Sequence, residues 1–282
     1  MGKNMKRIKL IVAYDGTAYV GWQIQKNGLA IEQVLNEHLS RLLKEDIAVI
    51  GCSRTDSGVH ARGNVAVFDT GTKIPAGKIS YALNQSLPAD IRIVKSREVP
   101  ADFHPRYAST GKTYEYTILN CRYNVPTLRL YSDYVYYPLD AEKMRKGAEY
   151  LLGEHDFTAF STAGGQQKSP VRTITDISVT AQYLNPDADP EEDACEGFRP
   201  QIIRIRVTGT GFLYNMVRII AGTLEKAGLG IYPPEHVKEI LESRDRSLSA
   251  PKAPARGLTL VKIHYPEDGP ETVPDKMDNL PD

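Results

Sequence analysis

The stretch from Val49 to Phe68 reads VIGCSRTDSGVHARGNVAVF, with an apolar run at each end and a polar loop between them. Short apolar runs bounded by turn residues are typical of strands, so residues 49–52 and 64–68 are predicted to be strands. The loop packs two arginines, an aspartate, a histidine and several hydroxyls into ten positions. Polar groups held at the rim of a rigid sheet are well placed to act on a ligand. The stretch therefore predicts a sheet-based fold with a candidate site at one rim.

A plain turn is the alternative interpretation of the same loop. Asp56, Ser57 and Gly58 supply ordinary turn chemistry, and Arg54 could pair with Asp56 in solvent. His60 could equally be a hydrogen-bonded structural histidine. The loop lacks a second carboxylate and a cluster of metal ligands, so the pattern gives little support to paired-carboxylate or metal chemistry.

Outward from this loop, strand-like and helix-like patterns are mixed. Residues 7–14 alternate as a strand does, and apolar residues recur at helical spacing over residues 30–44. The same reasoning predicts a helix at 77–86, strands at 90–94 and 112–118, a helix at 140–152, strands at 171–183 and 201–208, helices at 213–227 and 234–243, and a strand at 258–264. Several strands are consecutive, which predicts an α+β fold with a largely antiparallel mixed sheet and flanking helices.

Two short strings have counterparts later in the chain. A strand, then Gly16 to Tyr19, then a helix is echoed by a strand, then Gly209 to Phe212, then a helix; Ala61-Arg62-Gly63 is echoed by Ala255-Arg256-Gly257. Short strings that contain glycine often match by coincidence. If the echo is a true duplication, it predicts two similar subdomains around a central cleft, a usual place for a site.

The charge balance is misleading as a single number. The chain has 282 residues with 35 Lys or Arg and 35 Asp or Glu, and this zero net charge argues against a nucleic-acid partner. Yet residues 185–201 and 266–282 each hold six acids and one base. The rest of the chain therefore carries 33 bases and 23 acids, about +10, so a polyanionic partner is allowed.

Composition also bears on class and compartment. Hydrophobic residues make up 41% and charged residues 25%, which is ordinary for a folded soluble protein. Cys52, Cys121 and Cys195 form neither a disulfide framework nor a metal motif, which favours a reducing compartment. The apolar run near the N-terminus ends at Asp15, too short for a signal sequence or a membrane span. We therefore expect a cytoplasmic protein.

The string RTDSGVHARGNV closely resembles the active-site motif of the tRNA pseudouridine synthase A family, in which the aspartate of RTDxGVHA is catalytic. Seven further stretches agree in order and spacing: YDGTAYVGWQ (14–23), LNQSLPADIRI (83–93), FHPRYASTGKTYEY (103–116), HDFTAF (155–160), SPVRTI (169–174), GFLYNMVRIIAGTL (211–224) and KAPARGLTL (252–260). The resemblance covers about residues 8–264. Where the family usually has a TVQ-like helix start, this chain has AIEQ at 30–33, which touches no expected catalytic residue.

The resemblance implies a pseudouridine synthase fold and a role for each matching residue. Asp56 is expected to be the nucleophile or charge-stabilising carboxylate, Arg218 to pair with it, and Tyr114 to face the target uracil. Arg54 is expected to help hold the space of a flipped nucleotide. The resemblance leaves open whether the carboxylate first attacks ribose C1′ or uracil C6.

Substrate-binding candidates are His60, His104, Arg106 and Lys112, with Arg54 and Tyr114. His104, Arg106 and Lys112 could contact phosphate or simply be solvated. Tyr114 on an alternating strand could instead be a half-buried core aromatic, and Tyr19 and Trp22 fit packing better than base stacking. Arg218 lies in the apolar stretch MVRIIAG, where an unpaired charge is costly to bury, which favours a carboxylate partner.

The expected protein is thus an isomerase that makes pseudouridine at positions 38–40 of the tRNA anticodon arm, as a homodimer, without metal or other cofactor. We expect a subdomain at 1–107 with the aspartate loop, a second at 108–265 with an acidic insertion at 185–201, and a disordered acidic tail at 266–282. The alternatives are a non-catalytic tRNA-binding or folding factor on the same scaffold, and a synthase for another RNA position.

Overall fold

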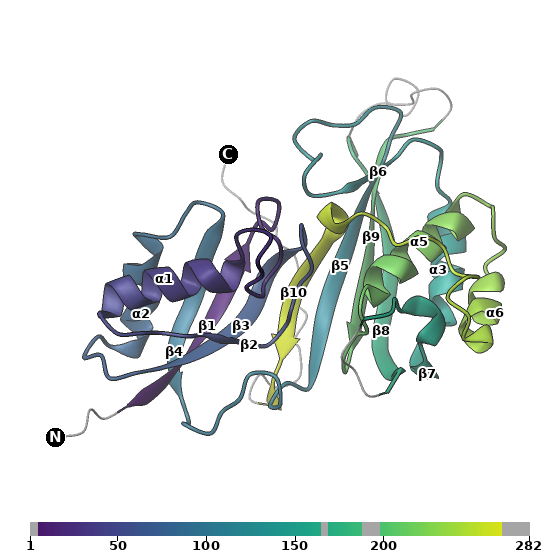
Figure 1. Ribbon diagram of the computed structural model, residues 1–282. Helices are drawn as coiled ribbons and strands as arrows, with labels where there is room; N and C mark the ends of the chain where they lie inside the picture. The colour runs from purple at the N-terminus through teal and green to yellow at the C-terminus, as the bar shows by residue number, and fades with distance from the viewer. Residues whose placement is uncertain (1–4, 165–168, 188–197, 267–282) are drawn as a thin grey trace.

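A ten-stranded sheet runs through the computed structural model, which describes residues 5–164, 169–187 and 198–266 (Figure 1). Its strands follow the spatial order β4–β1–β3–β10–β5–β9–β8–β7, with β2 beside β3 and β6 beside β5. Their bounds are β1 Lys6–Tyr14, β2 Ile50–Gly51, β3 His60–Thr70, β4 Ile91–Val99, β5 Gly111–Asn120, β6 Asp133–Val135, β7 Gly153–Asp156, β8 Val171–Tyr183, β9 Gln201–Gly209 and β10 Leu258–His264. Neighbours are antiparallel except β10 with β3 and β5 with β6. The predicted α+β class with a mostly antiparallel sheet is confirmed.

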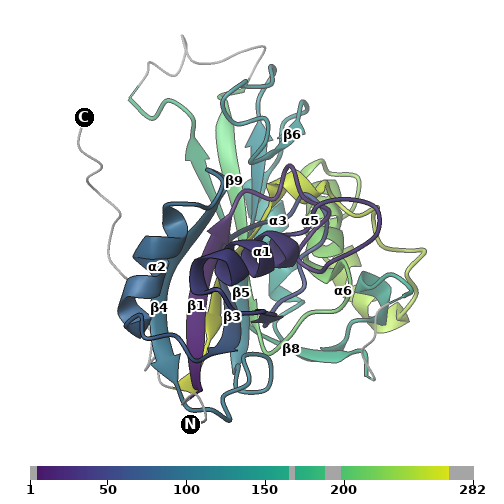
Figure 2. The same ribbon diagram turned by 60° about the vertical axis from the view of Figure 1, so that its left-hand side comes forward.

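Helices pack along this sheet in two groups, which lie apart in Figure 1; in the turned view of Figure 2, α1 is drawn in front of the region of α3 and α5. One group, α1 (Ile31–Leu43) and α2 (Ala76–Asn84), lies by β1 to β4. The other group, α3 (Ala141–Glu149), α5 (Met216–Gly228) and α6 (His236–Ser243), lies by the β5 to β9 half. Two short 3-10 turns, η1 (Thr158–Phe160) and η2 (Ala255–Gly257), complete the described part of the chain.

Apolar periodicity explains why these elements form. In α1, Ile31, Val34, Leu35 and Leu39 are buried, a spacing that puts them on one helical face. In β1, alternate residues from Ile8 to Tyr14 are buried. The hydrophobic core therefore lies between the helices and one face of the sheet.

The structure extends or adds elements where pairing comes from distant residues. β3 begins at His60 instead of Asn64, because His60 and Ala61 pair with Thr259 and Leu260 of β10. β4 continues to Val99 because it stays paired with β1 as far as Arg7. The predicted helix at 140–152 ends at residue 149, and β7 then pairs with β8. Neither β7 nor β6 was predicted, since both are short and depend on partners far along the chain.

The internal echo is local. β1 and β9 each lead through a glycine-containing turn into a helix, α1 and α5. However, β1 and β3 are adjacent and antiparallel. Their counterparts β9 and β10 are separated by β5. Because both are antiparallel to β5, they are parallel to each other. Ala61 to Gly63 lie within β3, while Ala255 to Gly257 form η2. The two halves therefore differ in strand order.

The predicted boundary between residues 107 and 108 falls in the connection from β4 to β5, and one sheet continues through both halves. The division into subdomains and a cleft between them stays a prediction. Most of the predicted acidic insertion (188–197) and of the tail (267–282) lies outside the described residues. Within the described ranges, no helix has the length and apolar character that crossing a membrane requires.

Candidate active site

The loop between β2 and β3 carries Asp56 and is held by the segment that follows β1. The backbone N–H of Trp22 donates to the carbonyl of Thr55 at 3.1 Å, and that of Gly58 donates to the carbonyl of Tyr19 at 3.4 Å. Tyr19 and Trp22 are 4% and 1% exposed, which confirms that they are packing residues. Two separate sequence motifs thus form one structural unit.

Two glycines allow this close approach. A Cβ on Gly16 would lie 2.1 Å from the carbonyl oxygen of Val59, and one on Gly21 would lie 2.5 Å from that of Thr55. Gly21 also has φ +105°, a conformation that glycine adopts without a side-chain clash. The backbone of residues 16–22 therefore touches the backbone of the Asp56 loop directly.

Arg218 on α5 forms an ion pair with Asp56, as the resemblance implied. Its Nη1 lies 3.7 Å from Oδ2 of Asp56, and the two side chains are 11% and 28% exposed. The Nε of Arg218 donates to the carbonyl of Ala253 at 2.8 Å. Burial of the guanidinium is thus offset by a carboxylate and a backbone acceptor, which is what a charge inside an apolar helix needs.

The electrostatics of Asp56 are a balance of opposed effects. Burial raises the pKa of the Asp56 carboxyl above its ordinary value, and the positive charges of Arg218 and Lys252 oppose that rise. The net direction is upward. The carboxyl is therefore a partly desolvated acid whose ionisation depends on the two neighbouring cations.

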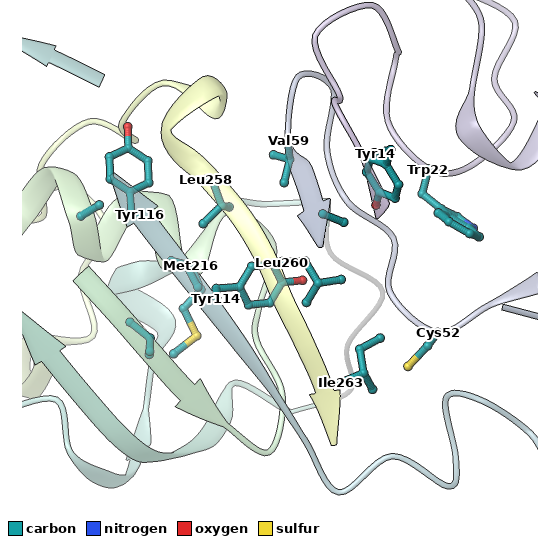
Figure 3. Packing of buried hydrophobic residues seen from close by; sticks show 14 of the residues in the cluster. Tyr14, Trp22, Cys52, Val59, Tyr114, Tyr116, Met216, Leu258, Leu260 and Ile263 are labelled. Carbon is teal, nitrogen blue, oxygen red and sulfur yellow. The ribbon is translucent and has the colours of Figure 1, made fainter. Parts of the chain in front are cut away.

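Tyr114 lies on β5, where Figure 3 shows it beside its strand partner Leu260 on β10. The ring is 8% exposed and meets Phe212 edge to face, with centroids 5.2 Å apart. Its hydroxyl shares a 2.9 Å hydrogen bond with Ser53 Oγ. Burial raises the pKa of Tyr114, so at neutral pH the side chain is a neutral phenol. It is both a core aromatic and a neighbour of the Asp56 loop.

Lys112, Arg106 and His104 gather near the end of β5 at which Tyr114 lies. Lys112 Nζ donates to Ser53 Oγ at 3.3 Å. Burial lowers the pKa of Lys112, and the charge of Arg106 contributes to this lowering. Arg106 is exposed, and the His104 ring stacks on that of Tyr107 with centroids 4.2 Å apart. Of these three predicted substrate-binding residues, Lys112 is thus joined to the loop directly, and Arg106 is near enough for its charge to act on Lys112.

His60 differs from the other candidates, because both of its ring nitrogens are engaged inside the protein. Nδ1 accepts from the backbone N–H of Gly16 at 3.1 Å, and Nε2 lies 3.0 Å from the carbonyl of Leu130, which can only accept. The residue is 5% exposed. This geometry favours the structural alternative for His60. Arg54, by contrast, is exposed two residues before Asp56.

Sequence reasoning missed three residues at this site. Ser53 joins Tyr114 to Lys112, Lys252 acts on the charge of Asp56, and Asn215 contacts Arg218 with its side-chain oxygen at 3.1 Å. All three stand next to or within motifs that the resemblance had singled out. Their chemistry was visible in the sequence, but the partner of each one was not.

Comparison with known proteins identifies the family of the chain. The family model described as tRNA pseudouridine synthase matches residues 10–108 and 148–266. The chain is 44% identical over 261 residues to "tRNA pseudouridine synthase A" of Thermoanaerobacter sp. (strain X514) and 47% identical over 261 residues to that of Ruminiclostridium cellulolyticum. It is 47% identical over 264 residues to "tRNA pseudouridine synthase A 2" of Clostridium perfringens. Each alignment covers 93% of this chain and 100% of the relative. The chain therefore belongs to the tRNA pseudouridine synthase family.

Proposed function

We propose that this protein converts uridine to pseudouridine at positions 38–40 in the anticodon arm of tRNA, with Asp56 as its catalytic carboxylate. The observation that carries the proposal is the Asp56–Arg218 pair. A partly exposed carboxylate in the loop that carries the family motif lies 3.7 Å from a guanidinium on α5. Burial alone would favour the protonated acid, so the guanidinium has a clear purpose in keeping Asp56 ionised.

The chemistry follows from that pair. A uridine stacked in a stem-loop has to be flipped out before a side chain can reach its glycosidic bond. Asp56 then attacks ribose C1′ or uracil C6, the N1–C1′ bond breaks, and the base turns. C5 bonds to C1′, Asp56 is released, the C5 proton leaves, and N1 takes up a proton. The step needs no oxidant or reductant, and that no metal or other cofactor takes part stays a prediction.

The other side chains take supporting parts. Arg54, exposed beside Asp56, fills the space that the flipped nucleotide leaves or holds a phosphate. The Tyr114 ring packs on the uracil. Burial raises the pKa of its hydroxyl, so the neutral phenol accepts the C5 proton only as its own proton is relayed through the Ser53 hydroxyl, which passes its proton on to solvent. Arg106 and Lys112 contact the RNA backbone with His104.

The partners and setting follow the same resemblance. A homodimer is supported by the family alone, and light scattering of the purified protein measures it directly. Cys52 and Cys121 are buried free thiols, which supports a reducing cytoplasm. A non-catalytic tRNA-binding factor is less well supported, because such a protein has no need to keep Arg54, Asp56, Tyr114 and Arg218 together.

The decisive experiment replaces Asp56 and maps the product. Asp56→Asn is expected to abolish pseudouridine formation in tRNA while leaving the Kd for tRNA within about 2-fold, since one neutralised carboxylate adds no phosphate contact. Asp69→Asn is the matched control, because Asp69 pairs with Arg7 on the surface. Product mapping in tRNA from cells with and without the protein gives the uridine position. An active Asp56→Asn protein would overturn the mechanism.

A further inference from the structure

Asn215 has an unusual backbone for its place in the fold. It is the residue before the first turn of α5, with φ 61° and ψ 7°, and it is 6% exposed. Within the described ranges, the other non-glycine residues with positive φ are Lys44 and Arg244, which follow the last turns of α1 and α6. A left-handed residue is common at a helix C-terminus, where it caps the last carbonyls. Asn215 precedes a helix, so capping of the last carbonyls does not explain its left-handed conformation.

The side chain of Asn215 is tied at both ends. Its Oδ1 accepts from Arg218 Nη1 at 3.1 Å, and its Nδ2 donates to Thr162 Oγ1 at 2.8 Å. The backbone N–H of Thr162 in turn donates to the carbonyl of Tyr214 at 3.3 Å. These bonds leave a single orientation for the carboxamide, with its oxygen on the guanidinium.

Two neutral oxygens therefore fix the guanidinium of Arg218. The carbonyl of Ala253 holds Nε at 2.8 Å, and Asn215 holds Nη1 at 3.1 Å. With both contacts in place, Nη1 stands 3.7 Å from Asp56 Oδ2, within ion-pair range but beyond a normal hydrogen bond. The positive charge acts on Asp56 without a short hydrogen bond that would occupy a lone pair of the carboxylate.

We propose that Asn215 is a positioning residue that sets the distance between Arg218 and the catalytic carboxylate. It lets Arg218 keep Asp56 ionised while the oxygens of Asp56 stay available to the substrate. The left-handed backbone turns the carboxamide toward Arg218. This proposal rests on the proposed function, in which Asp56 is the reacting group.

Three variants separate this role from a purely structural one. Asn215→Gly keeps the left-handed backbone at no steric cost and removes the carboxamide. Asn215→Asp keeps an acceptor on Arg218 but adds a carboxylate that competes with Asp56 for the guanidinium. Thr162→Val leaves Asn215 in place and removes the acceptor that holds its Nδ2. Lys44→Gly is the matched control, a left-handed residue replaced by glycine at the far end of α1.

The measurements are the single-turnover rate of pseudouridine formation against pH, the Kd for tRNA and the Tm. For Asn215→Gly we expect a rate lower by up to about 10-fold and a Kd within about 2-fold of the wild type. We expect a modest fall in Tm, because relief of the left-handed backbone offsets only part of the two lost hydrogen bonds. The acidic limb of its pH profile should move to higher pH, because Asp56 loses part of the cation's effect. Asn215→Asp should move that limb furthest, and Thr162→Val should give a smaller change in the same direction.

Lys44→Gly should match the wild type in rate and in pH profile. If Asn215→Gly keeps the wild-type rate and an unmoved acidic limb of the pH profile, the proposal is overturned. If Asn215→Gly fails to fold, the same result in Thr162→Val overturns it. Asp56→Asn is measured alongside. If that variant stays active, the proposed catalytic role of Asp56 fails, whatever the Asn215 variants show.

Discussion

The proposed role of Asp56 requires a carboxylate that is both charged and reachable, and different features of its surroundings bear on the two requirements. Partial exposure of 28% leaves the carboxylate reachable from solvent, but the same partial burial raises its pKa. Arg218 opposes that rise from the helix side, and the exposed Lys252 adds a second positive charge that acts in the same direction. A charged carboxylate in a partly desolvated place is a stronger nucleophile than one that water surrounds.

A second acidic residue on α5 has its own consequence for stability. Burial, and to a smaller extent the negative charge of Asp133, raise the pKa of Glu225 from 4.5 to about 7. The folded chain therefore holds this proton more tightly than the unfolded chain does. The stability that this group contributes is full below pH 4.5 and is lost as the pH rises to about 7.

Glu225→Gln should therefore be more stable than the wild type at pH 8, by on the order of 1–2 kcal/mol, and the difference should shrink or reverse at pH 4.5. Urea denaturation at the two pH values measures this. Glu239→Gln on α6 is the control, because Glu239 is paired with His236 on the surface. Equal stability of Glu225→Gln and the wild type at pH 8 would contradict the prediction.

At the scale of elements, the site depends on contact between the loop after β1 and the loop before β3. The two backbones meet at Gly16 and Gly21, which leave no room for a Cβ. The sheet holds the ends of both loops, because β1 pairs with β3 along most of its length. The position of Asp56 is therefore set by residues 16–22 as much as by its own loop.

Gly21→Ala should displace the Asp56 loop, since its Cβ would lie 2.5 Å from the carbonyl oxygen of Thr55 and its φ of +105° strains alanine. We expect a stability cost of about 1–3 kcal/mol and a larger relative loss of pseudouridine formation. Gly77→Ala in α2 is the control: a Cβ there meets nothing within 4 Å. It should be stabilising by about 0.5–1 kcal/mol and leave the rate unchanged. Full activity of Gly21→Ala at a temperature where it is folded would contradict this account.

At the scale of the whole molecule, charge is divided unevenly along the chain. The zero net charge is the sum of a basic body and two acidic segments, 185–201 and 266–282. Three exposed cations are linked to the site. Arg54 stands two residues before Asp56, Lys252 opposes the rise in the pKa of Asp56, and Arg106 contributes to the lowering of the pKa of Lys112. A polyanion that reaches Asp56 therefore meets positive charge.

Affinity for tRNA should fall as salt is added, because bound phosphates release counterions. Truncation after Pro266 removes six acids and one base and keeps the packed Tyr265, so it should leave the affinity equal or tighter. Fluorescence anisotropy with labelled tRNA at several salt concentrations measures both effects. A full-length variant with the tail acids changed to Asn or Gln controls for length. Weaker binding by the truncated chain would show that the tail contributes to recognition.

Local pattern predicted nearly all the long elements, since each depends on its own apolar periodicity. The helix at Ile31–Leu43 and the strand at Val171–Tyr183 were predicted to within a residue. β6 and β7 could not be, because three or four residues carry no period and form strands only beside β5 and β8. The helix predicted from residue 213 starts at Met216, because the left-handed backbone of Asn215 does not belong to a right-handed helix.

The sequence by itself determined the fold class and the family resemblance, and the resemblance implied the Asp56–Arg218 pair. The fold class rests on local pattern, whereas the buried charge of Arg218 calls for a carboxylate partner without saying which one. Only the tertiary structure decided the environment of each side chain. It engaged both ring nitrogens of His60 inside the protein, joined Ser53 to Tyr114, and brought Asn215 to the guanidinium of Arg218. The physical reason is that burial, pKa and hydrogen bonding depend on groups that only folding brings together.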